Sequence, residues 1–156
     1  MQKQSQWKVA SPIGNLYLTA SKKGLQGVSF RTQNAPMKKS KILARAQRQL
    51  KEYFSGKRRN FDLKLDLSGT PFQQRVWKEL LRIPHGRTVS YKDVAVRIRN
   101  KKAVRAVGTA NGKNPLCIIV PCHRVFAHNG SLGGYSGGLN LKKRLLNLEG
   151  LPKFSF

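Results

Sequence analysis

The first third of the chain alternates apolar and polar side chains in short runs, which predicts strands joined by tight turns. Residues 7–10, 15–20 and 25–30 are such runs, and a Ser-Pro-Ile-Gly and a Ser-Lys-Lys-Gly turn separate them. Residues 41–54 instead repeat apolar side chains at helical spacing, at Ile42, Ala46, Leu50 and Phe54. Residues 61–67 alternate again, and we expect a fourth strand there. These elements together predict a small α/β unit.

The pattern changes after residues 68–69, and the remainder of the chain is mainly helical. The Thr-Pro-Phe-Gln segment from Thr70 combines an N-cap, a proline at the first helical position and a capping-box glutamine, so a helix begins here. The Ser-Tyr-Lys-Asp segment from Ser90 is a second capping box and begins a shorter helix. A polar turn then leads to residues 103–111, a third helix made mostly of small side chains. Helix, turn and helix at this spacing indicate a helix-turn-helix.

Two further apolar segments complete the second part of the chain. Residues 116–120 form a run typical of a buried strand, which Pro121 ends. Residues 139–148 predict a last helix that buries Leu141, Leu145, Leu146 and Leu148. We therefore expect two domains, an α/β domain at 1–69 and a mainly helical domain at 70–156.

Composition narrows the class of protein. The 156 residues carry a net charge of +25, three histidines and two cysteines. No apolar run approaches the ~18 residues that a membrane span needs, and two cysteines make no disulfide framework, so we expect a cytoplasmic protein without a membrane partner. No CxxC or HxxxH spacing is present, and residues 1–69 contain neither Cys nor His, so we expect no metal.

The positive charge predicts attraction to polyanions, with nucleic acid first and anionic membranes second. It is spread evenly, because residues 1–69 carry 15 basic and three acidic side chains and residues 70–156 carry 16 and three. A uniformly basic solvated surface therefore stays open as an alternative to a nucleic-acid site. The densest basic window is made of Arg82, Arg87, Lys92, Arg97, Arg99, Lys101, Lys102, Arg105 and Lys113.

The small side chains of the third helix allow another surface to approach it closely. Gly108 costs helix stability at this position, and it fits either tight packing inside the protein or an approach to a nucleic-acid groove. Arg105 lies in the middle of the small face, and Lys101 and Lys102 precede it. These charges favour the groove.

Cys122 is the strongest candidate for chemistry. It follows Pro121, and His123 comes directly after it; a neighbouring base raises the thiolate fraction that makes a cysteine nucleophilic. A buried, unreactive cysteine is the alternative, and it is the expectation for Cys117. Glu149 ends the last helix, where the helix dipole disfavours a carboxylate; it is either an exposed tail residue or a group that orients a base. The glycine-rich segment 129–138 lacks a P-loop ending and suits a pocket wall.

Pro121-Cys122-His123-Arg124-Val125 resembles the PCHR-V/I signature of the O6-alkylguanine-DNA alkyltransferase family. The resemblance covers essentially the whole chain, because other family motifs stand in the same order and spacing. They are Ser11-Pro12-Ile13-Gly14, Phe72-Gln73 with Val76-Trp77, Ile83-Pro84-His85-Gly86, Thr88-Val89-Ser90-Tyr91, Arg105-Ala106-Val107-Gly108, Asn114-Pro115, Gly134-Tyr135-Ser136-Gly137-Gly138 and Leu145-Leu146 with Glu149-Gly150.

The resemblance implies a fold and an activity. The fold is a ribonuclease-H-like α/β unit, a small sheet plus a helix, followed by a winged-helix-like domain with a helix-turn-helix. The activity is irreversible, single-turnover transfer of an alkyl group from O6 of guanine in duplex DNA to the protein's own cysteine, with O4-alkylthymine left open as a second substrate. The partner is double-stranded DNA that contains O6-alkylguanine. The protein is a monomer with no cofactor and no obligate protein partner.

The resemblance also implies residue roles at the reaction centre. Cys122 accepts the alkyl group, His123 takes its proton through a water, and Glu149 fixes the tautomer of His123. Asn114 supports the turn around the cysteine. The main-chain carbonyls of Cys122 and Val125 accept from the exocyclic amine of guanine.

Further roles concern the leaving oxygen and DNA. Tyr135, the Ser136 amide and Lys142 lie by O6. Tyr91 rotates the phosphate and donates to the purine ring nitrogen. The helix at 103–111 lies in the minor groove, with Arg105 filling the place of the flipped base. The remaining DNA contacts are Ala103, Ala106, Gly108, Thr109, Lys101 and Lys102.

Two other functions are distinguishable. In alkyltransferase-like proteins a tryptophan replaces the cysteine, and they bind the lesion without transfer; Cys122 argues against this class. A Cys-His hydrolase would turn over a small ester many times, whereas a transferase reacts once and stops.

Overall fold

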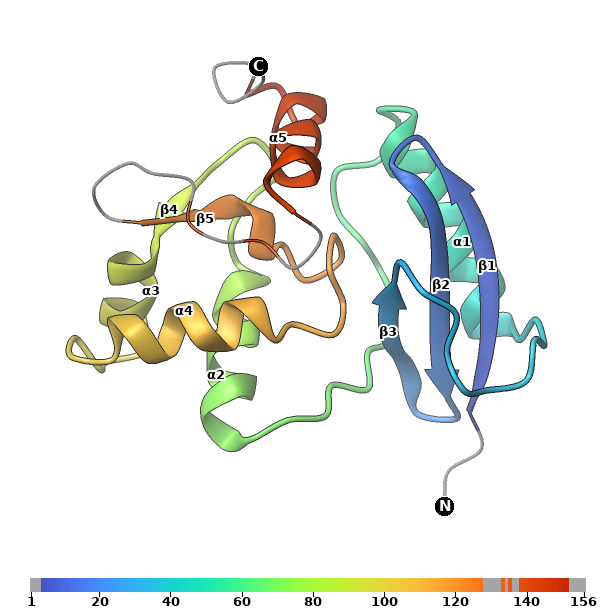
Figure 1. The fold of residues 1–156 in the computed structure, drawn as a ribbon, viewed down its shortest axis with the longest axis horizontal. Helices are drawn as coiled ribbons and strands as arrows, with labels where there is room; N and C mark the ends of the chain where they lie inside the picture. Colours follow the sequence, from blue (N-terminus) through green and yellow to red (C-terminus); the bar gives the residue numbers. More distant parts are fainter. Residues whose placement is uncertain (1–3, 128–132, 134, 136–137, 152–156) are drawn as a thin grey trace. The chain divides into compact units, whose positions relative to one another are not determined.

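The structure is a computed structural model that describes residues 4–127, 133, 135 and 138–151. The chain divides into two compact units, Met1–Ser68 and Gly69–Phe156, and Figure 1 labels the elements of each. In the described part of the chain, no helix is both long enough and apolar enough to cross a membrane.

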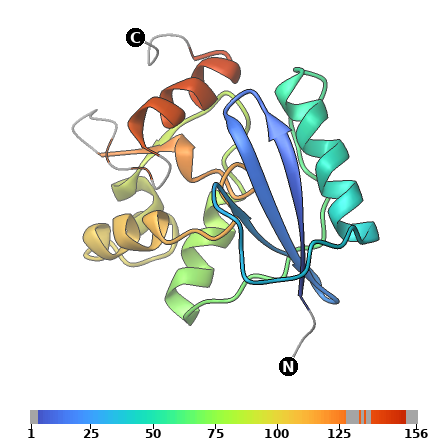
Figure 2. The same cartoon turned by 45° about the vertical axis from the view of Figure 1, so that its right-hand side comes forward.

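The first unit is a three-stranded antiparallel sheet with one helix. Strands β1 (Ser5–Ser11), β2 (Gly14–Ser21) and β3 (Gly24–Ser29) follow in the order β1-β2-β3, and helix α1 (Lys41–Phe54) packs along the sheet (Figure 2). Leu16, Leu18, Leu25, Leu43 and Leu50 are fully buried between them. The three strands and the helix agree with the sequence prediction.

The predicted fourth strand at residues 61–67 is wrong. Only Leu65 forms a bridge, to Leu25, and the hydrogen bonds beside it are Leu25 N to Lys64 O and Asp66 N to Leu25 O, both 2.8 Å. Gln49 on α1 satisfies the backbone of Asp62 instead, at 3.0 Å to its oxygen and 2.9 Å from its nitrogen. At Asp62, hydrogen bonds from the Gln49 side chain therefore stand where the backbone bonds of a sheet would be. An alternating sequence does not distinguish these two arrangements.

The buried face of α1 also differs from the prediction. Leu43, Gln49 and Tyr53 are buried, whereas Ile42 and Phe54 are half-buried. The apolar stripe of α1 is wide, so the helix could face the sheet at more than one rotation about its own axis. The hydrogen bonds of buried Gln49 with the 61–67 segment fix the rotation that is observed.

The second unit is mainly helical. Its elements are α2 (Pro71–Leu80), β4 (Val89–Ser90), α3 (Tyr91–Arg97), α4 (Val104–Gly112), the 3-10 helix η1 (Cys122–Arg124), β5 (Val125–Phe126) and α5 (Leu139–Leu148). Both predicted capping boxes are present, at Thr70 and at Ser90. Helices α2, α3 and α4 pack together, and Trp77 Nε1 donates to Ala110 O at 2.9 Å. Strands β4 and β5 pair in parallel.

Two details of the second unit correct the prediction. Residues 116–120 are not a strand, because residues 117–119 form a turn: Val120 N donates to Leu116 O at 2.8 Å, and Ile118 has a φ of 77°. The Asn114 side chain holds this loop. On α5 Lys142 is fully buried, whereas Leu148, predicted to be buried, is 40% exposed. Hydrogen bonds hold the loop at 116–120 and the Lys142 side chain in place, and hydrophobic periodicity does not report such bonds.

Candidate active site

Cys122 begins η1, directly after the loop at 116–120 and before β5. Its side chain is 2% exposed. Burial raises the pKa of the thiol, while a hydrogen bond from Asn114 and the charge of Lys142 lower it in part. The resting group is therefore a protonated thiol, and a nucleophilic reaction here needs a base that takes the proton.

His123 and Glu149 form a buried pair. His123 Nε2 lies 2.6 Å from Glu149 Oε2, and both side chains are completely buried. Because a carboxylate only accepts, Nε2 carries the ring proton and Nδ1 has the free lone pair. Nδ1 has no hydrogen-bond partner among the residues that the structure describes. Burial lowers the pKa of His123 while Glu149 opposes the shift, which keeps the imidazole neutral and able to accept a proton.

Arg124 is a member of this site that the sequence reasoning did not assign. Its Nε and Nη2 donate to the two Glu149 oxygens at 2.7 and 2.9 Å, and its Nη1 donates to Ile83 O at 2.7 Å. Burial alone raises the pKa of Glu149, but bonds to His123 and Arg124 outweigh it and hold the pKa well below its usual range. A carboxylate at a helix C-terminus needs a cation nearby, but the sequence does not say which cation supplies it.

Two asparagines hold the backbone around Cys122. Asn114 Nδ2 donates to Val120 O at 2.7 Å, and its Oδ1 accepts from Leu116 N at 2.9 Å. Asn111, on α4, donates from Nδ2 to Cys122 O at 3.3 Å. Asn114 was predicted to support this turn; Asn111 was not singled out, although it is polar on the buried side of α4 beside Ala110.

Lys142 is buried on α5. Its Nζ donates to Val125 O at 2.6 Å and lies 4.9 Å from the centroid of the Phe126 ring. Burial lowers its pKa to about 8, although the negative charge of a Cys122 thiolate raises it. Val125 O, predicted to accept from guanine, thus already accepts from Lys142, and a carbonyl oxygen has a second lone pair for another donor.

Tyr91 and Tyr135 lie near the cysteine. Tyr91 is the first residue of α3, and burial raises the pKa of its phenol, so the hydroxyl stays a donor. Gly133 lies so close that a Cβ on it would be 2.7 Å from the Tyr91 oxygen. A hydrogen bond from Tyr135 lowers the pKa of the Cys122 thiol in part. Ser136 lies outside the described residues.

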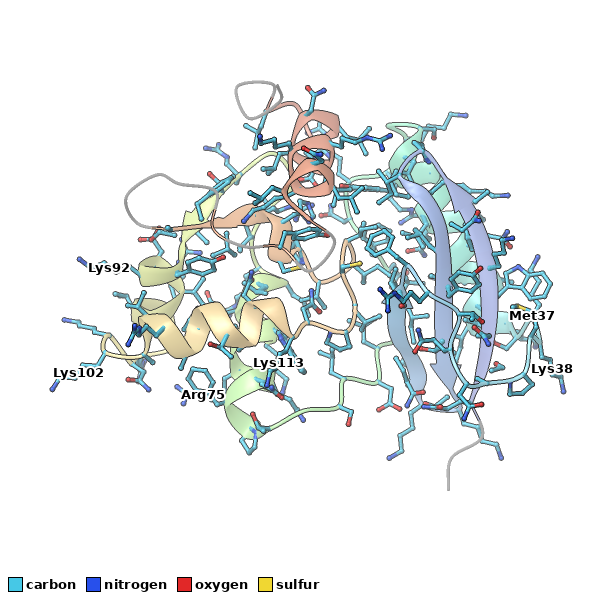
Figure 3. The ribbon with its side chains drawn as sticks, in the orientation of Figure 1. Met37, Lys38, Arg75, Lys92, Lys102 and Lys113 are labelled. Carbon is cyan, nitrogen blue, oxygen red and sulfur yellow. The ribbon has the colours of Figure 1, made fainter. Side chains whose placement is uncertain are left out.

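The predicted DNA-binding residues lie on the open side of α4 and on the turn before it. Arg105, Ala106 and Thr109 are exposed, as are Lys101 and Lys102, whereas Ala103 and Gly108 are half-buried. Figure 3 shows the Lys102 side chain extending outward at this turn. A Cβ on Gly108 would meet nothing within 4 Å. Tight packing inside the protein therefore does not explain Gly108.

Within 4–127, 133, 135 and 138–151, no three side chains of His, Cys, Asp or Glu gather in a way that could hold a metal ion.

Known proteins are similar to this chain over most of its length. Residues 8–67 match the ribonuclease-like domain of 6-O-methylguanine DNA methyltransferase, and residues 71–151 match its DNA-binding domain. A methylated-DNA–protein-cysteine methyltransferase of Methanosarcina barkeri is 47% identical, with 90% of this chain and 94% of the relative covered. The constitutive Bacillus subtilis protein of that name is 52% identical, with 75% and 72% covered. A crystal structure of Mycobacterium tuberculosis OGT in complex with DNA matches with a TM-score of 0.87 and 44% identity, with 97% of this chain and 94% of that chain covered.

Proposed function

The chain belongs to the 6-O-methylguanine DNA methyltransferase family, and we propose that it repairs DNA by moving an alkyl group from O6 of guanine to its own Cys122. The partner is double-stranded DNA that contains the lesion. The observation that carries the assignment of Cys122 is that it directly precedes His123, whose ring nitrogen Nε2 lies 2.6 Å from the buried Glu149 carboxylate. The transfer is irreversible, and each molecule reacts once.

The reaction is a direct displacement at carbon. The Cys122 sulfur forms a bond to the alkyl carbon, the bond from that carbon to O6 breaks, and its electron pair goes to O6. Before attack the thiol proton passes through a water to His123 Nδ1, the nitrogen that Glu149 leaves free. Arg124 keeps Glu149 ionised, so the carboxylate stabilises the imidazolium that forms.

Guanine recognition falls to groups around the cysteine. The carbonyls of Cys122 and Val125 accept from the exocyclic amine, and Tyr91 donates to the ring nitrogen. Tyr135, the Ser136 amide and Lys142 stabilise the negative charge on O6 as the alkyl group leaves. The buried ammonium of Lys142, hydrogen-bonded to Val125 O at 2.6 Å, supports this role.

The reacting atom lies inside the duplex, so the nucleotide has to leave the base stack. The open face of α4 enters the minor groove, where Ala103, Ala106, Gly108 and Thr109 allow close approach. Arg105 fills the place of the flipped base, Tyr91 rotates its phosphate, and Lys101 and Lys102 bind the backbone. The empty space around Gly108 supports this docking.

The cellular setting follows from the chemistry. Both cysteines are free thiols, which suits a reducing compartment, and we place the protein in the cytoplasm. It works as a monomer without a cofactor.

One measurement tests the function. After incubation with a duplex that contains O6-methylguanine, the peptide that holds Cys122 gains the mass of one methyl group, in one equivalent per protein. Cys122→Ala abolishes this gain but keeps DNA binding, because the thiol does not hold the duplex. An unmodified peptide together with tight lesion binding identifies a lesion-binding protein instead, and repeated turnover of a small ester identifies a hydrolase.

A further inference from the structure

Helix α4 has two faces with different tasks. Its open face carries Arg105 and Ala106, while its buried face carries Asn111, whose side chain is 3% exposed. A primary amide in such a position is costly unless its polar atoms have partners. Asn111 has no part in the mechanism above, although it touches two residues that do.

Asn111 contacts both of these residues through its side chain. Nδ2 donates to Cys122 O at 3.3 Å. Burial and the charge of Cys122 raise the pKa of Tyr91, and a hydrogen bond with the Asn111 side chain lowers it. The Asn111 side chain is therefore hydrogen-bonded to the Tyr91 hydroxyl as well as to the Cys122 carbonyl.

The remaining polar atom of Asn111 is the amide oxygen Oδ1, an acceptor to which no described residue donates. Among the residues that the structure describes, Asn111 Oδ1 is buried and has no hydrogen-bond partner. Buried acceptors of this kind are rare, and a ligand that brings a donor satisfies them. The Asn111 side chain therefore adjoins the Tyr91 hydroxyl, holds the Cys122 carbonyl and leaves its own Oδ1 as an open acceptor.

We propose that Asn111 is a specificity-determining positioning residue that aims the Cys122 carbonyl and the Tyr91 hydroxyl at the guanine edge carrying the exocyclic amine. That edge offers an N–H donor and a ring-nitrogen acceptor, which match the carbonyl and the hydroxyl. O4-alkylthymine has no exocyclic amine, so it leaves the acceptors unmatched, and a site built around hydrogen bonds rejects such an analogue. This inference rests on the proposed function and names how that site selects its base.

The test pairs one substitution with one change in the substrate. Asn111→Leu keeps a similar volume without polar atoms, and the two substrates are the free bases O6-benzylguanine and O6-benzylhypoxanthine, which differ only in the amine. The wild-type protein should alkylate Cys122 about tenfold faster with the amine-bearing base, because one hydrogen bond is worth about that much. Asn111→Leu should lose most of that preference by slowing the amine-bearing base alone. Free bases are used because they remove DNA binding from the measurement.

Two further variants make the result decisive. Asn147→Leu removes an exposed amide on α5 and should keep the wild-type preference. Asn111→Ala removes the same polar atoms in a smaller side chain and serves if the leucine variant does not fold, as judged by its melting temperature. Equal slowing of both bases in a folded Asn111 variant, or an unchanged preference, overturns the inference. A wild-type protein that gains no methyl mass on the Cys122 peptide from an O6-methylguanine duplex contradicts the proposed function itself.

Discussion

The two units carry nearly equal charge, but they place ionisable side chains in different environments. In the first unit, among the described residues, the buried polar side chains are Gln6, Ser21 and Gln49, all uncharged. The second unit buries His123, Arg124, Lys142 and Glu149 around one cysteine. Uncharged amides complete the backbone hydrogen bonding of a small sheet at low cost. Taking a charge out of water is costly, and the buried charges of the second unit gather at the proposed reaction centre.

The largest expected effect compares a carboxylate from each unit. Glu149→Ala should lower the free energy of unfolding by about 3–5 kcal/mol, because it leaves buried Arg124 without its partner. Glu52→Ala, which removes a surface ion pair with Arg58 at 3.0 Å, should cost less than about 1 kcal/mol. Urea unfolding at neutral pH measures both. Equal costs would remove the contrast between the units.

Arg105 tests whether a positive charge of the second unit acts specifically in base flipping. Arg105→Ala should slow repair in a duplex by about a hundredfold, because the unstacked base loses its replacement. Reaction with free O6-benzylguanine should hardly change. Lys22→Ala removes an equal charge from an exposed turn of the first unit and should affect neither rate. If Arg105→Ala slows both substrates to the same degree, the residue does not act in base flipping.

The pH dependence of stability sharpens the comparison further. The pKa of folded Glu149 lies below its ordinary value, so its ionised form stabilises the fold above the unfolded-state pKa of about 4.3. That contribution is lost as the pH falls from there through the folded-state pKa. When the free energy of unfolding is plotted against pH, Glu149→Gln should therefore reduce the loss of stability at acid pH. Glu52→Gln should leave that loss unchanged. If Glu149→Gln loses as much stability at acid pH as the wild-type protein, groups other than Glu149 cause that loss.

The smallest effect concerns one glycine from each unit. Gly108→Ala should stabilise the protein by about 0.5–1 kcal/mol, because the helix gains a better former and the new methyl meets nothing. It should also weaken duplex binding, because the methyl enters space that the groove needs. Gly24→Ala should destabilise, since its φ is +156° and its Cβ would lie 2.6 Å from Lys64 O. Melting temperatures and duplex titrations measure these changes. Unaltered duplex binding in Gly108→Ala would contradict groove docking.

Local signals made the helices predictable. The capping boxes at Thr70 and Ser90 depend on residues three positions apart, and both are present in the structure. Segments 61–67 and 116–120 were mistaken for strands. The side chain of Gln49 bonds the backbone of Asp62 in the first segment, and the side chain of Asn114 bonds the backbone of Leu116 and Val120 in the second. Such long-range polar contacts leave no period in the sequence.

The candidate site shows the same limit. Cys122 and His123 are neighbours and stand out by residue type, and Glu149 drew attention at the wrong end of a helix dipole. Arg124 and Asn111 were missed because their roles depend on their hydrogen-bond acceptors, the Glu149 carboxylate and the Cys122 carbonyl. Only the fold brings these acceptors next to them. Lys142 entered only through the family resemblance, since its position on α5 favours solvent until the burial of that face is known.

The guanidinium of Arg124 has a consequence for how acidity reaches the reaction. It cannot lose its proton in a protein, and it holds both oxygens of Glu149. Glu149 therefore behaves as a fixed anion through the whole range in which an imidazole titrates. Among the three groups Cys122, His123 and Glu149, only the His123 ring can therefore change its protonation in mild acid, because the Cys122 thiol is already protonated there and the Glu149 carboxylate keeps its charge.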